Sequence, residues 1–187
     1  MENDLLKLII AGSGGQGILF IGRLLAHAVM LTGKEVTWFP SYGAEIRGGT
    51  ASCTVIISDE MVASPVIQKP DALIIMNKAS LEKFENRLKT GGLLIMNQSL
   101  IKTAPQRSDI EVIAVKANDI AEEIGDSRVA NVVMLGVLIG KTGMPDMDIT
   151  LRALREIIPL EKQSMLTVNE TALKRGIKEV DSKSQCS

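Results

Sequence analysis

The 187-residue chain has 45% hydrophobic residues, 3% aromatic residues and a formal net charge of −1. This length predicts one domain with a well-buried core. The near-neutral charge excludes a nucleic-acid or polyanion surface, and the scarcity of aromatic residues excludes a platform on which bases stack. No apolar run reaches the roughly 20 residues that a membrane span requires, and the start "MENDLLKL" does not resemble a signal peptide. We therefore expect a cytoplasmic protein without membrane or nucleic-acid partners.

Residues that ligate metals are few. The sequence has two cysteines, Cys53 and Cys186, and one histidine, His27. An iron–sulfur cluster usually takes four cysteines, and no CxxC or zinc-type spacing is present. Any metal centre that serves this protein is therefore expected on another chain. Cys53 is interpreted as a small buried hydrophobic residue, and His27 as a packed or partly exposed helix residue without a catalytic role.

The first part of the chain predicts strands separated by a helix and a polar loop. The helix is apolar on nearly every side, so both of its faces should be covered, and Gly33 stands at its expected C-cap. The second strand is expected to stop at Pro40. The predicted elements are a strand at 7–11, a helix at 16–31, a strand at 35–39, a loop at 41–50 and a strand at 51–58.

The remainder predicts further strands and then a helical end. Strands are expected at 71–76, 91–97 and 110–115, with a short helix at 80–88, and later helices at 118–124, 131–141, 146–158 and 161–178. Strands that alternate with helices indicate a Rossmann-like, three-layer α/β domain with a mostly parallel sheet, helices on both faces and a helical C-terminal part. We expect one domain over 1–180 and a flexible polar tail over 181–187.

A glycine-rich turn follows the first strand. Gly12, Gly14 and Gly17 fit the dinucleotide fingerprint G-x-G-x-x-G between a strand and a helix. The second half of that fingerprint is missing, because the second strand ends in "WFP" where an acidic residue should bind the ribose. NAD or FAD binding is therefore disfavoured. Two interpretations remain, tight packing of the helix on the sheet and an anion site without an adenosine pocket, such as one for a phosphate of coenzyme A.

The segment "SYGAEIRGGT" is the more unusual motif. Ser41 and Tyr42 carry hydroxyls, and Glu45 and Arg47 place opposite charges two residues apart. Gly48 and Gly49 permit a turn that larger residues would not. From the residues alone, a surface loop with a solvated ion pair is the favoured interpretation, because charged loop residues are mostly exposed.

The motifs in their order give a more specific indication. "GSGGQGI" after the first strand, "SYGAEIRGG" after the second, then "TVIIS" and "PDALIIMN", resemble the gamma subunit of 2-oxoacid:ferredoxin oxidoreductases. The similarity continues through "DSRVANVVMLGVLIG" to "LTVNETALKRG" and covers roughly Leu5 to Gly176. Ala44 departs from the family pattern, since proline is frequent at that position, and the closing helix is only loosely similar.

The resemblance implies a noncatalytic role within a larger enzyme. The family decarboxylates a 2-oxoacid oxidatively with coenzyme A, giving acyl-CoA, CO2 and reduced ferredoxin. Thiamine diphosphate and Mg²⁺ are expected between alpha and beta subunits, and [4Fe-4S] clusters on the beta subunit or a ferredoxin-like subunit. The chain would then be inactive alone, with no catalytic or metal-binding residues of its own. The resemblance favours 2-oxoglutarate or a branched-chain 2-oxoacid, with the indolepyruvate enzyme as the nearest rival.

Two loops are the candidate sites. The first is expected at a coenzyme A phosphate or a subunit seam, with pure packing as the alternative. The second is expected at an interface or channel, where Arg47 is the best candidate to bind an anion or a partner's carboxylate. Asn131 is interpreted as a helix start. The first loop comprises Gly12, Ser13, Gly14, Gly15, Gln16 and Gly17, and the second contributes Tyr42, Glu45, Arg47, Gly48 and Gly49.

Two other functional classes remain in play. One is a stand-alone Rossmann-like protein that binds NAD or FAD, which the missing acidic residue argues against. The other is an interaction module that associates with itself. A gamma subunit expressed alone is also expected to form homodimers through the interface that its partners would otherwise cover. A measured mass of the isolated chain therefore does not distinguish a gamma subunit from a self-associating module.

Overall fold

The computed structural model describes residues 5–42, 50–61 and 64–184. Within this part, one six-stranded sheet has the order β2-β3-β1-β4-β5-β6. The expected alternation of strands and helices is confirmed, with most boundaries shifted by only a few residues. The strands are β1 (Leu6–Ser13), β2 (Glu35–Tyr42), β3 (Thr50–Ser58), β4 (Ala72–Ile75), β5 (Leu93–Asn97) and β6 (Glu111–Val115).

The sheet is mostly parallel, as expected, but one strand is reversed. β1, β4, β5 and β6 pair in parallel along the sheet. β3 pairs antiparallel with both β1 and β2, so it is inserted between two strands that run in the same direction. Only residues 43–49 connect β2 to β3. A parallel crossover requires a dozen or more residues, so this short connection returns the chain antiparallel to the strand that it leaves.

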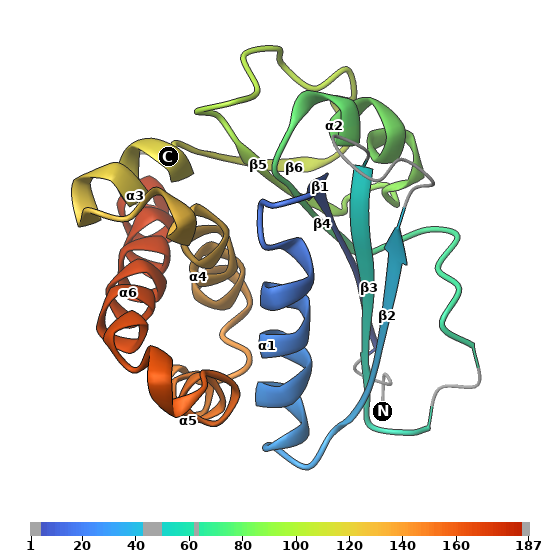
Figure 1. The fold of residues 1–187 in the computed structure, drawn as a ribbon. Helices are drawn as coiled ribbons and strands as arrows, with labels where there is room; N and C mark the ends of the chain where they lie inside the picture. The colour runs from blue at the N-terminus through green and yellow to red at the C-terminus, as the bar shows by residue number, and fades with distance from the viewer. Residues whose placement is uncertain (1–4, 43–49, 62–63, 185–187) are drawn as a thin grey trace.

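Helices cover both faces of the sheet, with two helical layers on one face and a single short helix on the other (Figure 1). α1 lies between the sheet and an outer layer formed by α3 to α6, whereas α2 lies on the opposite face. This sandwich explains why α1 is apolar on nearly every side. The helices are α1 (Ile18–Met30), α2 (Lys78–Phe84), α3 (Ala117–Ile124), α4 (Ala130–Thr142), α5 (Met147–Ile157) and α6 (Ser164–Ser184), with short 3-10 turns at Glu85–Arg87, Ser127–Val129 and Leu160–Lys162.

Glycines bring the backbones of α4 and α6 together. α4 is buried from Ala130 through Ile139, as its nearly uninterrupted apolar sequence predicts. A Cβ atom added to Gly136 would lie 2.3 Å from the Leu173 carbonyl oxygen, and one added to Gly176 would lie 2.1 Å from the Val133 carbonyl oxygen. No side chain fits at either position, so the helical C-terminal part of the fold depends on this close contact.

The second strand differs from its expected end. β2 continues through Pro40 to Tyr42, with Pro40 opposite Cys53 and Ser41 opposite Ser52. The expectation that Pro40 stops the strand and that Ser41 and Tyr42 lie in a loop is therefore wrong. β2 is the edge of the sheet. A proline is tolerated there because one side of an edge strand needs no N–H donor for the sheet ladder.

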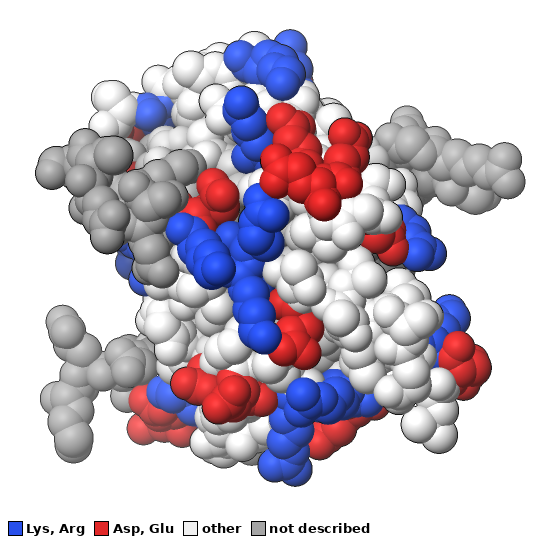
Figure 2. Space-filling view, turned by 90° about the vertical axis from the view of Figure 1, so that its left-hand side faces the viewer, with Lys and Arg blue, Asp and Glu red and all other residues white. Residues whose placement is uncertain are grey.

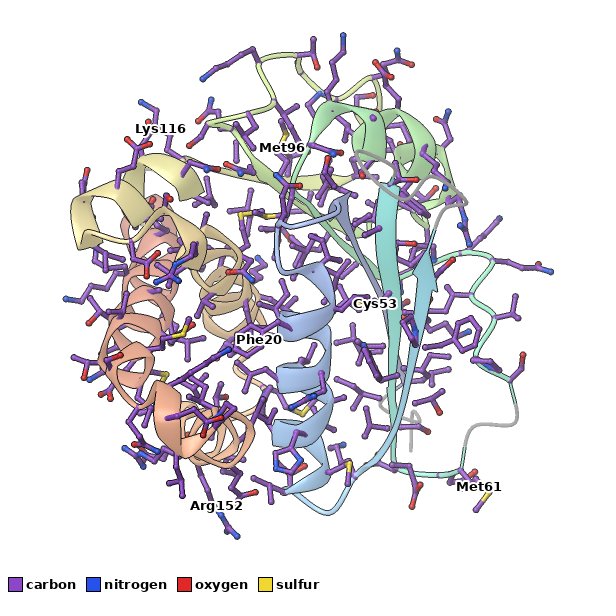
Figure 3. All side chains as sticks on the ribbon, in the orientation of Figure 1. Phe20, Cys53, Met61, Met96, Lys116 and Arg152 are labelled. Atoms are coloured by element: carbon purple, nitrogen blue, oxygen red, sulfur yellow. The ribbon has the colours of Figure 1, made fainter. Side chains whose placement is uncertain are left out.

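Cys53 is buried, as expected, in the core between the sheet and α1 (Figure 3). Its thiol donates to the Ile18 carbonyl oxygen over 3.7 Å. Burial raises the pKa of the Cys53 thiol to about 12, and the neighbouring Trp38 indole opposes this shift more weakly.

We predict that the Cys53 thiol does not react with thiol reagents in the native protein. In a Cys186→Ser variant, native chain should not react with a thiol-specific disulfide reagent at pH 8, whereas chain unfolded in urea should react fully, because the thiolate is the nucleophile. Since the folded pKa is raised, the neutral thiol stabilises the fold fully below the unfolded pKa of roughly 8.5, and this stability declines as pH rises toward 12. Rapid labelling of the native variant would contradict the prediction.

The outer helical layer is charged with both signs. Figure 2 shows Lys and Arg interleaved with Asp and Glu on this face, without a large field of one sign. Several charges are paired, including Arg175 with Glu123 and Lys174 with Glu170, at 2.5 Å in each case. α6 extends to Ser184, into the expected tail, and no helix in the described ranges is long and apolar enough to span a membrane.

Candidate functional site at the carboxyl edge of the sheet

The glycine loop after β1 and the strand ends that flank the second motif meet at one edge of the sheet. Ala51 of β3 pairs on one side with Gly12 of β1 and on the other side with Tyr42 of β2. Its neighbour Thr50 pairs with Ser13. Tyr42 and Thr50 flank the segment 43–49, so both ends of that segment lie beside the glycine loop. This is the carboxyl end of β1, where open α/β sheets bind their ligands.

Gln16 closes the glycine loop on itself. Its side-chain Oε1 accepts a hydrogen bond from the Ser13 backbone N–H at 2.7 Å, and the Gln16 N–H donates to the Ser13 carbonyl oxygen at 3.2 Å. Gly12 is buried below this turn, and a Cβ there would lie 2.6 Å from Gln16 Oε1 and 2.9 Å from Met76 Cβ. Gly12 and Gln16 therefore have structural roles, and the Ser13 amide already has an acceptor.

The tip of the loop is open. A Cβ added to Gly14 or Gly15 would meet no atom within 4 Å among the described residues, and both residues are exposed. Gly15 has a φ of +91°, which favours glycine, whereas Gly14 does not have a positive φ. The loop thus divides into packed glycines at its base and accessible glycines at its tip.

Asn131 fixes the other end of the loop. Its side-chain Nδ2 donates to the Gly17 carbonyl oxygen at 3.0 Å, from the first turn of α4. Gly17 precedes α1 with a φ of +70°, and a Cβ there would lie 2.1 Å from Asn131 Nδ2. Asn131 lies near the start of α4, as predicted. The contact of Asn131 with a loop 114 residues away was not predicted. The sequence feature that could have indicated it is a polar amide within an otherwise apolar run.

A row of amides along this edge was also missed. Asn77 follows β4 and donates through Nδ2 to Ser13 Oγ, while its Oδ1 accepts from the Ser80 N–H at 2.8 Å and caps α2. Asn97 ends β5, is fully buried, and donates to Asn118 Oδ1 at 2.7 Å. The signal was present in the endings "IIMN" and "LIMN" of two adjacent strands. These amides hold the loops that follow β1, β4 and β5 at fixed positions.

The strand order bears on the dinucleotide interpretation. In a mononucleotide-binding fold of that type, β2 lies beside β1, so an acidic residue at the end of β2 reaches the ribose of a nucleotide bound at β1. Here β3 separates the two strands, and β2 carries Phe39, Pro40 and Ser41 near its end. The described geometry therefore lacks both the acidic residue and the adjacency that this fingerprint requires.

Part of the second motif lies outside the described residues. Glu45, Arg47, Gly48 and Gly49 belong to segment 43–49, and the side chain of Tyr42 is likewise outside what the structure describes. Their expected role at an interface or channel therefore stays a prediction. The structure places only the two strand ends to which this segment is attached, at the carboxyl end of β1.

Potential metal ligands and the single histidine lie apart from the glycine loop or from one another in the described structure. No group of three His, Cys, Asp or Glu residues is placed to hold a metal ion in the described ranges. His27 lies in the last turn of α1, away from the glycine loop, where its Nε2 is 2.7 Å from Glu156 Oε2. Hydrogen bonds from His27 and then Arg152 lower the pKa of Glu156. This pair links α1 to α5 and fits the packing role expected of His27.

The sequence pattern identifies the family to which this fold belongs. Residues 7–179 match the family model described as pyruvate ferredoxin/flavodoxin oxidoreductase. The chain belongs to this family. The match covers all six strands and all but the end of α6, so the family assignment extends over nearly the whole described fold.

Similar proteins of this family include separate subunits and longer chains. The 2-oxoglutarate synthase subunit KorC of Methanocaldococcus jannaschii is 32% identical, over 88% of this chain and 90% of its own length. The ketoisovalerate oxidoreductase subunit VorA of Methanothermobacter marburgensis is 40% identical over 75% of this chain. The chain spans only about a third of the VorA sequences that it matches, 30% and 35% in two species. An indolepyruvate oxidoreductase subunit, IorB, is a weaker match.

A solved structure confirms the architecture. The gamma subunit of a keto/oxoacid ferredoxin oxidoreductase from Geobacter sulfurreducens superimposes with a TM-score of 0.82 at 28% identity. The likeness covers 95% of this chain and 99% of that subunit. The expected Rossmann-like fold is therefore confirmed, and so is the resemblance to gamma subunits.

Proposed function

We propose that this chain is the gamma subunit of a 2-oxoacid:ferredoxin oxidoreductase, which converts a 2-oxoacid and coenzyme A to acyl-CoA and CO2 and reduces ferredoxin. The observation that carries the proposal is the family match over residues 7–179, which includes both glycine-rich motifs. The glycine loop and the strand ends that flank the second motif lie at one edge of the sheet, which supports a shared role for the two motifs. The chain acts as part of an oxidoreductase and is inactive alone.

The remaining chemistry belongs to partner chains in this proposal. Thiamine diphosphate and Mg²⁺ are held by alpha and beta subunits, and [4Fe-4S] clusters by the beta or a ferredoxin-like subunit, in a complex that works in the cytoplasm. Cys53 is buried with a raised pKa and is therefore no candidate cluster ligand. The proposed partition matches the inventory of this chain, which has two cysteines where a cluster usually takes four.

The substrate is proposed to be 2-oxoglutarate or a branched-chain 2-oxoacid. The KorC and VorA relatives, named for 2-oxoglutarate and ketoisovalerate, support these two choices. The test is anaerobic dye reduction by the purified complex with 2-oxoglutarate, 2-oxoisovalerate, pyruvate and indolepyruvate. A preference for either of the first two supports the proposal, whereas a preference for pyruvate or indolepyruvate would contradict this choice of substrate.

The tip of the glycine loop is proposed to face a phosphate of coenzyme A or a subunit seam. Gly14 and Gly15 are exposed and leave space for a ligand or a partner to approach the backbone. The loop precedes α1, a 13-residue helix whose N-terminal dipole favours an anion. The base of the loop, by contrast, is fixed by Gln16 and Asn131 and serves packing.

A Gly14→Asp substitution distinguishes these roles. The side chain enters open space, so the midpoint of thermal unfolding should change little. A carboxylate near a bound phosphate should raise KM for coenzyme A about tenfold and leave KM for the 2-oxoacid unchanged, because like charges repel. If the loop lies at a seam, the variant should instead be lost from the complex. Unchanged assembly and kinetics would leave packing as the role of the whole loop.

Arg47 is proposed to bind an anion or a carboxylate of another subunit through its planar guanidinium. Arg47→Lys keeps the positive charge but removes the bidentate hydrogen bonding of the guanidinium. The substitution should therefore weaken assembly or raise the concentration of coenzyme A that the complex requires several-fold. Gel filtration and coenzyme A titration of the variant complex measure the two effects. Wild-type behaviour in both would reject this role, while the subunit assignment would stand.

A further inference from the structure

A partly apolar groove begins beside the first turn of α1. Its first part, near α6, has a volume of about 430 Å³ and runs between α1, the edge strand β2 and the connection from α5 to α6. Phe20 lines the groove from the side of α1 that faces the outer helices (Figure 3). The apolar walls are formed by Leu19, Phe20, Trp38, Ile157, Ile158 and Met165.

The groove continues toward the end of α1. A second hollow of about 520 Å³ shares Arg23, Trp38 and Ile157 with the first and ends at Met30. Met30 is 58% exposed, and Leu160, in the connection from α5 to α6, is 84% exposed. Large apolar side chains exposed around a continuous hollow are typical of a surface that another polypeptide covers.

The two ends of the groove differ in charge. Arg23 and Lys162 line the first part of the groove, both are exposed, and neither contacts a carboxylate among the described residues. No acidic residue lines that part in the described ranges. At the far end, Glu156 is already paired with His27 and Arg152. Within the described structure, the first part therefore presents two unpaired cations beside apolar walls.

We propose that this groove docks an amphipathic segment of another subunit, whose apolar side chains fill the hollow beside Phe20 and Trp38 and whose carboxylates pair with Arg23 and Lys162. The proposal rests on the proposed function, in that it requires the chain to work within a hetero-oligomer. None of the described residues of the two glycine-rich motifs lines this groove.

Charge argues against a second copy of this chain as the occupant. A two-fold symmetric contact whose axis passes beside Arg23 and Lys162 would bring these cations close to those of the other copy. Like charges brought together at an interface cost free energy, whereas carboxylates on a different chain would be attracted. Complementarity therefore selects an acidic partner.

The longer relatives make a covering segment structurally reasonable. In the VorA relatives the matching region is only about a third of a longer polypeptide. In those chains a single polypeptide carries this region together with further segments.

Site-specific photo-cross-linking tests the proposal in the assembled complex. A photoreactive phenylalanine analogue at Leu160, in an affinity-tagged chain expressed in its host, should form a cross-link to one segment of a different subunit that contains both apolar and acidic residues. The matched control carries the analogue at Val112, an exposed apolar residue on β6 at the opposite edge of the sheet, and should not cross-link to that segment. Cross-links to a second copy of this chain, or none at all, would overturn the proposal.

Charge reversal supplies an independent measurement. Arg23→Glu with Lys162→Glu should reduce retention in the complex about tenfold during gel filtration at low salt, and high salt should shrink the difference from wild type. Lys69→Glu is the control, because Lys69 is exposed and does not line the groove. Equal retention of the double variant and the control would overturn the proposal. If the wild-type chain recovers no other subunit, the proposed function itself fails, which is a separate outcome.

Discussion

Gly176→Ala should destabilise the protein by about 2–3 kcal/mol, although alanine is ordinarily the better helix former by about 1 kcal/mol. The added Cβ would lie 2.1 Å from the Val133 carbonyl oxygen and 2.9 Å from Gly136 Cα. Both are backbone atoms of α4, so the helices must separate. Their separation loosens the contact that holds the C-terminal part of the fold together.

Two further glycines provide a graded control for this prediction. Gly136→Ala should be comparably harmful, because its Cβ would lie 2.3 Å from the Leu173 carbonyl oxygen. At Gly140 the tightest contacts, to Ile177 Cα and its carbonyl oxygen, are 3.1 Å, so Gly140→Ala should be much milder. Thermal unfolding should show a fall of roughly 5–10 °C for Gly176→Ala. A greater loss for Gly140→Ala than for Gly176→Ala would contradict the packing described.

Gly17→Ala should cost about 2–3 kcal/mol for a different reason. The position has a φ of +70°, which costs an L-residue roughly 1–2 kcal/mol, and the added Cβ would lie 2.1 Å from Asn131 Nδ2. Urea unfolding measures the free energy. Asn131→Ala in the same chain should remove the collision but not the backbone cost, so the two substitutions should be less than additive.

Gly14→Ala is the matched control in the same loop. Its φ is not positive and its Cβ would meet no described atom within 4 Å, so the change should stay within about 0.5 kcal/mol. If Gly17→Ala proved as mild as Gly14→Ala, the contact between Asn131 and the loop would not hold the loop in place. The difference between the two variants thus isolates the packed base of the loop from its open tip.

Most of the fold could be predicted from apolar periodicity. The continuous burial of α4 and the covering of α1 on both faces follow from helices that are apolar on every side. The direction of β3 follows from its short connection to β2, but its place between β1 and β2 could not be predicted, because the sequence of an apolar strand does not specify its neighbours. Pro40 misled for a related reason, since its tolerance depends on β2 being an edge strand, which only the strand order determines.

The candidate site was predictable in its backbone but not in its side-chain network. A strand, a glycine-rich turn and a helix place Gly12 through Gly17 at the carboxyl edge by chain geometry alone. The partners of that loop, Asn77 and Asn131, come from residues 64 or more positions away. Such contacts depend on tertiary packing, which sequence spacing does not encode. Amides that end or interrupt apolar runs were the available signal.

The subunit assignment is tested most directly by anaerobic affinity purification of the tagged chain from its native host. Mass spectrometry identifies the proteins that co-elute, and the eluate is assayed for dye reduction that depends on both a 2-oxoacid and coenzyme A. We predict recovery of thiamine-binding subunits and an iron–sulfur subunit together with that activity. Recovery of this chain alone, with thermal stabilisation by NAD or FAD, would contradict the assignment and restore the dinucleotide interpretation of the glycine loop.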